Sequence, residues 1–214
     1  MRGVEQIPWL YDLGLAFGEA RGLGRWRRWL VRGATGRTLD LGTGTGRNLP
    51  LLPPGVRAIA VDPHPDALVR ARRRGPAVPL VVARAEALPF RDGAFDTVLA
   101  GLVLCSVVDP TAALAEARRV LRRGGALRLL EHVRAGGLVG RLQDLVQPAW
   151  TAFSGGCHPN RDTERAVTES GFAIDPATRR ARGTMRRLEA RAPGPVSPPA
   201  AAGPGGSPPR PGSR

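Results

Sequence analysis

The glycine-rich segment at residues 39–48 constrains this chain of 214 residues more than any other. Its sequence, LDLGTGTGRN, predicts a buried strand that ends in a tight turn, because glycines allow positive φ and let the backbone approach a ligand closely. A dinucleotide site would need GxGxxG, but Arg47 stands where the third glycine belongs. The GxGxG spacing favours an adenosyl ligand without a pyrophosphate. A turn with no ligand is the structural alternative.

Apolar, strand-like runs alternate with helical patterns from residue 38 to residue 133. This alternation predicts an α/β fold with a Rossmann-like, doubly wound and mostly parallel sheet. We expect its strands at residues 38–41, 58–61, 80–83, 97–100 and 126–131.

The most clearly marked helix follows the fourth expected strand. Asp109 is a typical N-cap, Pro110 suits the first helical position, arginines fall in the last turn, and Gly124 is the expected terminator. Further helices are expected at residues 138–150 and 162–170, and residues 172–177 and 185–190 predict a closing strand hairpin.

The two ends of the chain differ from its centre. Residues 7–32 carry Trp, Leu and Phe at roughly helical spacing, which predicts one or two helices that pack on the sheet, cover a pocket or lie at a surface. The last residues are mostly Pro, Gly, Ala and Ser and are expected to be disordered, because they bury too little to offset their ordering entropy. We therefore expect a helical cap at 1–34, a central domain at 35–191 and a tail at 192–214.

Residues that suit the same ligand follow the other expected strands. Asp62 ends the second strand, where this architecture places an acidic side chain that accepts hydrogen bonds from two ribose hydroxyls. A helix N-cap is the structural alternative for Asp62. Ala85 and Glu86 follow the third strand, and Leu102 follows the fourth.

The ordered segments LDLGTGTGRN, AVDPHP, ARAEALPF, FDTVLAGLVLCSV, RRVLRRGG and LLEHV resemble the class I methyltransferases, which use S-adenosylmethionine (SAM). The resemblance covers roughly residues 35–190 and implies this fold, SAM as cofactor and methyl transfer. It also implies which residues contact the cofactor. The methionine end of SAM is expected near Asp40, Gly42, Gly44 and Gly46, the ribose near Asp62, the adenine near Ala85 and Glu86, and the methyl group near Leu102. Thr43 and Pro63 adjoin these residues and are expected to contact SAM as well.

A narrower resemblance covers residues 102–172. There LVLCSV, EHV, QPAW and GGCHPNR are similar to the methyltransferase-like group that contains the animal alkyl-thiol methyltransferases and related bacterial proteins. This similarity implies a thiol or another soft nucleophile as acceptor. Two departures are expected to matter: Cys105 and Ser106 replace the paired His of many small-molecule members, and the N-terminal membrane anchor of the animal members is not expected here.

The acceptor is expected beyond the carboxyl ends of the strands, where doubly wound sheets bind ligands. Cys105 and His132 are the candidate catalytic residues there, with Glu131 beside them. His132 suits proton transfer because its unperturbed pKa lies near neutrality. The structural alternatives are a His satisfied by backbone hydrogen bonds, a small buried Cys, and a Glu that forms an ion pair.

A loop at residues 150–161 is expected to wall an apolar pocket with Trp, Phe, Cys and His side chains. Arg161 either binds an anionic group or caps local structure. Cys157 and His158 have too few further ligands in view for zinc, so no metal is expected.

Composition argues against several classes of protein. The net charge is +14, yet all 32 basic residues are Arg and only 5% of residues are aromatic, so specific nucleic-acid binding is not expected. Two cysteines outside any CxxC pair predict no disulfide framework and a cytoplasmic location. No membrane span or signal peptide is expected, whereas peripheral membrane contact and the oligomeric state stay open.

Three functions fit these observations. The first is methyl transfer to a small thiol or similar soft nucleophile. The second keeps the enzyme class but takes a phospholipid amine or a quinone-type ring as acceptor. The third is a SAM-binding module without turnover, against which the intact glycine turn and Asp62 argue.

Overall fold

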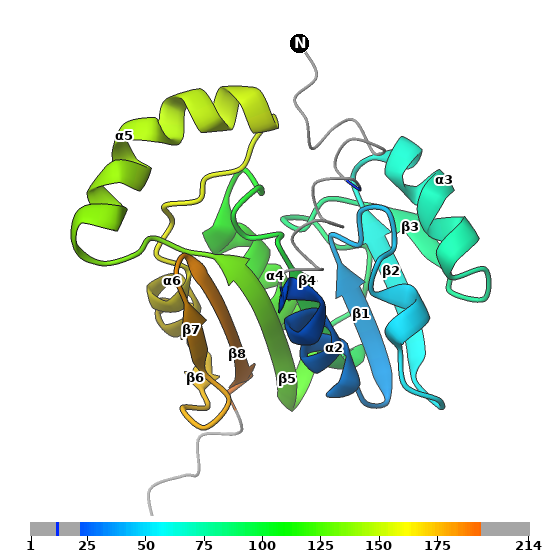
Figure 1. The fold of residues 1–214 in the computed structure, drawn as a ribbon. Coiled ribbons are helices and arrows are strands. Elements are labelled where there is room, and N and C mark those ends of the chain that lie inside the picture. Colours follow the sequence, from blue (N-terminus) through cyan, green and yellow to red (C-terminus); the bar gives the residue numbers. More distant parts are fainter. Residues whose placement is uncertain (1–11, 13–21, 194–214) are drawn as a thin grey trace, which may run out of the picture.

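The computed structural model of the chain describes Asp12 and residues 22–193. One mixed sheet crosses the molecule and carries helices on both faces, which confirms the expected α/β class (Figure 1). Most of the expected N-terminal helical region and nearly all of the expected tail, residues 1–11, 13–21 and 194–214, lie outside the described residues.

The sheet contains all the strands that the sequence predicted and one more. Its order is β3-β2-β1-β4-β5-β8-β6, with β7 also paired to β8. The first five strands are parallel, and β8 runs antiparallel to β5. The strands are β1 (Arg37–Leu41), β2 (Arg57–Asp62), β3 (Leu80–Val82), β4 (Phe95–Gly101), β5 (Leu121–His132), β6 (Ala173–Ile174), β7 (Arg180–Arg182) and β8 (Met185–Arg191).

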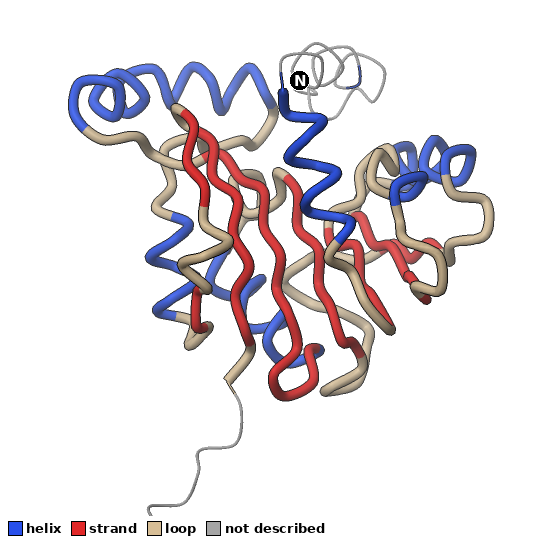
Figure 2. Tube along the Cα trace, turned by 60° about the horizontal axis from the view of Figure 1, so that its bottom comes forward, coloured by secondary structure: helices blue, strands red, loops and turns tan. Residues whose placement is uncertain are grey.

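Two apolar layers cover the sheet, because successive side chains of a strand point to opposite faces. On β4, Leu99 packs with Leu30 of α2, whereas its neighbour Val98 packs with Leu114 of α4. Figure 2 shows these helices on either side of the strands. The helices are α2 (Gly24–Arg32), α3 (Pro65–Arg74), α4 (Pro110–Val120), α5 (Gly137–Ser154) and α6 (Thr163–Glu169), with a short 3-10 helix, η3 (Leu49–Leu51).

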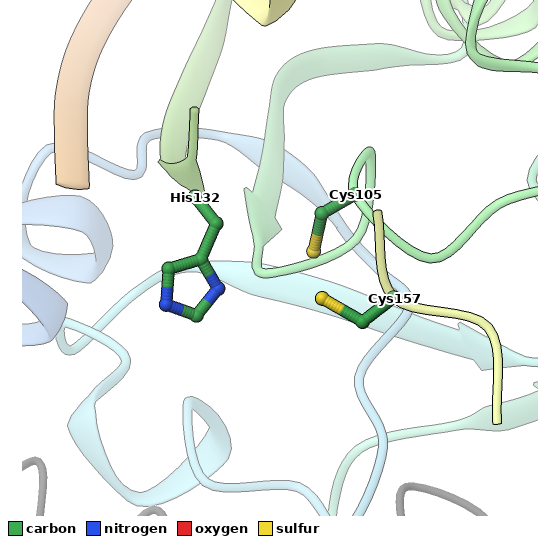
Figure 3. Close-up of side chains that lie close together, drawn as sticks. All are labelled: Cys105, His132 and Cys157. Carbon is green, nitrogen blue, oxygen red and sulfur yellow. The ribbon is translucent and has the colours of Figure 1, made fainter. Parts of the chain in front are cut away.

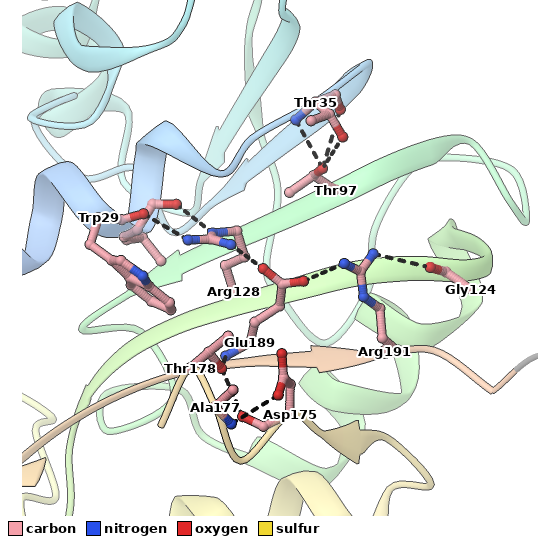
Figure 4. A network of polar contacts seen from close by, with 11 residues as sticks. Trp29, Thr35, Thr97, Gly124, Arg128, Asp175, Ala177, Thr178, Glu189 and Arg191 are labelled. Atoms are coloured by element: carbon pink, nitrogen blue, oxygen red, sulfur yellow. Dashed lines mark hydrogen bonds and ion pairs between the residues drawn. The ribbon is translucent and has the colours of Figure 1, made fainter. Parts of the chain in front are cut away.

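A buried arginine ties α2 to the sheet (Figure 4). Arg128 of β5 donates to the backbone oxygens of Trp29, at 2.7 Å, and Leu30, at 2.8 Å, and pairs with Glu189 of β8. These oxygens belong to the last turn of α2, where carbonyls have no intrahelical partner. Arg191 also pairs with Glu189, so two guanidinium groups share one carboxylate.

The helix after β4 starts as predicted but ends earlier. The carboxylate of Asp109 accepts hydrogen bonds from the N–H groups of Thr111 and Ala112, which confirms the N-cap. Gly124 as terminator was wrong, because α4 ends at Val120. The following Leu121 is buried and extended and already belongs to β5, and Gly124 lies inside β5 with φ of +70°, where the pairing with β4 shifts register.

The C-terminal strands differ from the expected simple hairpin. Both β6 and β7 pair with β8. The sequence did not reveal β7, because its three residues, Arg-Ala-Arg, are exposed and show no apolar alternation. Ala192, expected as the first residue of the tail, is buried in the core and donates its N–H to the oxygen of Gly125.

Helix α5 lies beyond the carboxyl end of β5 rather than against a face of the sheet (Figure 1). Its buried residues are Gly140, Gln143 and Ser154, and the Gln143 amide bonds to backbone groups of Val133, Ala135 and Pro159. Large apolar side chains instead lie exposed along the helix: Leu138, Val139, Leu142, Leu145, Val146, Trp150 and Phe153. Among the described residues, no helix combines the length and apolar character that crossing a membrane would need.

Candidate functional site

A pocket of about 500 Å³ lies at the carboxyl ends of β1, β2 and β4, where the strand order reverses. Doubly wound sheets bind ligands at this position. We call one part of its lining the turn end: Gly42, Gly44, Thr45, Asp62, Pro63, His64, Ala67, Ala83, Arg84, Ala85 and Glu86. The other part is the loop end: Leu102, Val103, Ser106, Val107, Val108, Gly155, Gly156 and His158.

A second pocket, of about 580 Å³, lies near the amino ends of β1 and β2. Its lining includes Arg37, Arg57 and Pro79 and none of the site residues predicted from the sequence. We therefore take the pocket at the carboxyl ends as the functional site.

The three glycines of the turn have different roles. All have positive φ, between +55° and +81°. A Cβ on Gly44 would meet nothing within 4 Å, so this glycine leaves open space at the pocket. A Cβ on Gly42 would lie 2.6 Å from Val103, and one on Gly46 would lie 2.7 Å from the Cα of Ala71 in α3. Gly46 therefore serves the packing of the turn on α3.

Asp62 is held rigidly at the turn end. One carboxylate oxygen accepts the N–H of Gly44 at 2.8 Å, and the other accepts the N–H of His64 at 2.9 Å. Burial raises the pKa of Asp62 above its usual 3.8. Each carboxylate oxygen has a further acceptor site, so the anchored group can still bind hydroxyls of a ligand.

Asp40 supports the turn from behind and does not line the pocket. It is fully buried and accepts hydrogen bonds from Thr43 Oγ1 at 2.6 Å and Asn48 Nδ2 at 2.7 Å. Arg27 of α2 donates to the other side of the Asn48 amide. Burial raises the pKa of Asp40. Three residues that were expected around the ligand thus shape the turn instead: Asp40, Thr43 and Gly46. The other residues expected to bind the cofactor line the pocket.

Leu102 has the only positive φ among the described residues other than glycine, +64°. Its N–H donates to the oxygen of Leu130 at 2.7 Å, and the residue lines the pocket directly after β4. A left-handed conformation costs a residue of this kind about 1 to 3 kcal/mol and tends to occur at functional sites. The strain therefore lies in the pocket lining.

Glu131 positions the loop that follows Leu102. It is buried and accepts the N–H groups of Val103, at 2.8 Å, and Leu104, at 3.0 Å. Burial raises its pKa to about 7. Glu131 thus fixes the backbone of this loop, a role that the sequence did not suggest.

The loop after α5 packs on the loop after β4. The N–H of His158 donates to the oxygen of Cys105 at 2.7 Å. Arg161 donates to the oxygens of Leu104, at 2.5 Å, and Val107, at 2.8 Å. Arg161 therefore caps local structure, one of its two predicted roles. His158 lines the loop end, and the Gln147 amide holds its Nδ1 at 2.9 Å.

The packing of these loops gathers Cys105, His132 and Cys157 (Figure 3). The two sulfurs and a ring nitrogen of His132 all lie within 4.8 Å of one another. A hydrogen bond from the Cys105 thiol lowers the pKa of Cys157, and the same pairing, with burial, raises the pKa of Cys105. The sequence pointed to Cys105 and His132 but not to Cys157 as their partner. None of the three lines the pocket itself.

Comparisons with known proteins agree with this geometry. Residues 39–129 match the family described as methyltransferase domain. The human thiol S-methyltransferase TMT1B is 36% identical over 154 residues, 67% of this chain and 63% of that protein. Human thiol S-methyltransferase TMT1A is 35% identical over 144 residues, 63% of this chain and 59% of that protein. The chain thus spans less than two thirds of the length of these relatives.

Solved structures share the fold. A SAM-dependent methyltransferase from Thermotoga maritima superposes with a TM-score of 0.66 at 23% identity, covering 86% of this chain and 95% of that one. One from Methanosarcina mazei gives a TM-score of 0.60 at 24% identity, covering 74% of this chain and 92% of that one.

Proposed function

The chain belongs to the class I SAM-dependent methyltransferases, and from that premise we propose that it transfers the methyl group of SAM to the sulfur of a small, partly apolar thiol. The observation that carries the proposal is that one pocket joins the turn end, which suits SAM, to a loop end with mostly apolar walls.

The residues of the turn end fit SAM. The open space at Gly44 accepts a ligand against the backbone, and Asp62 offers acceptors at a fixed position for the ribose hydroxyls. The pocket volume of about 500 Å³ falls in the range typical of small-molecule sites, about 300 to 1,000 Å³. In this assignment Ala85 and Glu86 lie beside the adenine, and Leu102 lies beside the methyl group.

SAM supplies a methyl group on a positively charged sulfur, so transfer is an in-line displacement that needs little covalent help from the protein. The task of the chain is to hold the acceptor in line with the methyl group and to exclude water. Correct positioning alone can supply effective molarities on the order of 10⁵ to 10⁸ M. Leu102, fixed by its bond to Leu130 in the pocket lining, is placed for this task.

A thiol acceptor is supported by two observations. Relatives at 35% and 36% identity are named thiol S-methyltransferases. The described residues of the loop end also offer no dense set of polar groups of the kind a strongly hydrogen-bonded acceptor requires, since Leu102, Val103 and Val107 form much of its wall. A free thiol has a pKa of about 8.5, and its reactive form is the thiolate, so turnover is expected to rise with pH.

The test is an acceptor panel with purified chain and SAM. Short alkyl thiols are expected to accelerate the formation of S-adenosylhomocysteine and to yield an S-methyl thioether detected by mass spectrometry. A chain that binds SAM but methylates none of the thiols contradicts the proposal. Slow formation of S-adenosylhomocysteine that no acceptor accelerates points to a SAM-binding module without turnover.

A second candidate acceptor is a phospholipid amine or a quinone-type ring. The exposed apolar face of α5 favours it, because this helix ends directly before Gly155 and Gly156 of the loop end and offers a surface to an amphipathic molecule or a membrane. The same panel decides between the two. Ready methylation of a phospholipid amine or a phenol, with no thioether product, replaces the thiol by this candidate.

A further inference from the structure

Three potential metal ligands converge behind the loop end of the pocket. Cys105 lies in the loop after β4, His132 ends β5, and Cys157 lies in the loop after α5. Their ligand atoms all lie within 4.8 Å of one another, and both sulfurs and the imidazole ring turn toward a common centre (Figure 3). Methyl transfer as proposed above uses neither sulfur, so the cluster needs its own explanation.

The backbone around the cluster is fixed by hydrogen bonds. The N–H of Cys157 donates to Ser154 Oγ at 3.0 Å, and its oxygen accepts Thr151 Oγ1 at 2.8 Å. The oxygen of Cys105 accepts the N–H of His158, which sets the two cysteine loops side by side. Both cysteines are buried, at 1% and 2% exposure, and His132 is half-buried. The fold therefore holds the three potential metal ligands in place without a metal.

We propose that Cys105, His132 and Cys157 bind a zinc ion and leave its fourth coordination position open. Thiolate and imidazole are the ligands that zinc prefers, and two Cys with one His is a known catalytic ligand set. Zinc distances of about 2.3 Å to sulfur and 2.0 to 2.1 Å to nitrogen place tetrahedral ligand atoms roughly 3.5 to 3.8 Å apart. The separations of up to 4.8 Å need to close by only about 1 Å, which side-chain rotations can provide.

The open position can take the acceptor thiol, a role that rests on the function proposed above. Ser106 follows Cys105, and Gly156 and His158 flank Cys157, so residues next to two of the ligands form the wall of the loop end. A thiol that binds zinc gives up its proton to water and stays bound as a thiolate. A lone pair of its sulfur then forms the new bond to the methyl carbon, while the old carbon–sulfur bond breaks and leaves its electron pair on S-adenosylhomocysteine. The neutral thioether, a weaker ligand, departs.

The site is tested with the purified full chain, stripped of metal with a chelator under reducing conditions and titrated with Co²⁺, a spectroscopic substitute for Zn²⁺. One Co²⁺ per chain is expected, with the near-ultraviolet thiolate-to-cobalt band and the strong visible bands of tetrahedral coordination, both displaced by Zn²⁺. Cys105→Ser and Cys157→Ser should each lose about half of the thiolate band, and His132→Gln should weaken binding at least tenfold. His158→Asn, a matched control outside the cluster, should bind Co²⁺ as the wild type does.

Several results would overturn the site: no stoichiometric binding by a folded chain, binding that survives Cys157→Ser unchanged, or a Cys105–Cys157 disulfide that reforms after reduction and does not yield to zinc. The role of the metal is separable from the site. A short thiol added without SAM should shift the cobalt bands. If the metal-free chain methylates thiols at an unchanged rate, the metal has no role in catalysis, but the proposed function stands. If the chain gives a normal cobalt spectrum but methylates no thiol, the proposed function is wrong, but the metal site stands.

Discussion

The two ends of the pocket are built in different ways. The turn end comes from short segments that each follow a parallel strand, so Gly44 after β1 and Asp62 at the end of β2 meet because neighbouring parallel strands finish at the same edge. The loop end needs two loops far apart in the chain, joined by the bond from His158 to Cys105. In the function proposed above, the general part of the reaction, holding SAM, is assigned to the ends of the regular sheet, whereas the selection of an acceptor is assigned to irregular loops.

Removal of the Asp62 carboxylate is expected to give the largest effect, confined to the turn end. Asp62→Ala leaves two ribose hydroxyls without their charged acceptor, at about 1.5 to 3 kcal/mol each, so SAM affinity should fall about 10²- to 10⁴-fold. Isothermal titration calorimetry measures this. Asp92→Ala, which alters an exposed carboxylate far from the pocket lining, should keep wild-type affinity. Wild-type affinity in a folded Asp62→Ala chain would mean that SAM binds elsewhere.

Replacement of His132 should affect the loop end alone. His132 is one ligand of the proposed zinc ion, which would favour the thiolate form of the acceptor, so His132→Ala should reduce thiol methylation about 100-fold at neutral pH. The deficit should shrink at alkaline pH, where the acceptor ionises unaided. Rates of thioether formation across pH, with SAM affinity measured beside them, check this. A deficit that is equal at every pH, or a matching loss of SAM affinity, would place His132 in a purely structural role.

Substitutions at two glycines of the same turn should have different effects, one mainly on SAM affinity and the other mainly on the stability of the fold. Gly44→Val fills open space at the pocket and should weaken SAM binding about tenfold or more, with a loss of stability limited to left-handed strain of about 1 to 2 kcal/mol. Gly46→Val adds a clash with the backbone of Ala71 and should cost about 1 to 3 kcal/mol beyond that strain. Thermal unfolding and calorimetry on both variants test the distinction. The reverse pattern would mean that Gly46, not Gly44, faces the ligand.

The smallest effect is expected from removal of the C-terminal segment, residues 193–214. A chain that stops after Ala192 keeps the buried alanine and its bond to Gly125 and loses mostly Pro, Gly, Ala and Ser. Its melting temperature and SAM affinity should equal those of the full chain. A drop of several degrees would show that the segment docks on the domain.

The sequence could mark Gly44, Asp62, Ala85 and Glu86, which line the turn end, because their signals are local; their contact with SAM stays a prediction. The GxGxG run, Asp62 and the residues at 85 and 86 each lie at the end of a strand that apolar patterning alone marks. The sequence did not distinguish glycines that face the ligand from those that pack, because that difference depends on Val103 and Ala71, which come from other segments. The sequence also did not reveal that Asp40 lies behind the turn, since its partner Asn48 lies beyond the turn.

The loop end was predicted only in part because its residues meet through tertiary contacts. Cys105 and His132 could be placed at neighbouring strand ends, but Cys157 joins them through contacts between two distant loops, such as the bond from His158 to the backbone of Cys105. No periodicity in sequence reports such a contact. The left-handed conformation of Leu102 was equally invisible, because leucine carries no preference for it.

A crystal structure of the chain with S-adenosylhomocysteine and a short alkyl thiol tests the central claim, that one pocket holds donor and acceptor at its two ends. The expected result is a ribose within hydrogen-bond distance of both Asp62 carboxylate oxygens, the homocysteine sulfur beside Leu102, and the thiol at the loop end in line with that sulfur. A ribose bound away from Asp62, or a thiol bound outside the loop end, would contradict it.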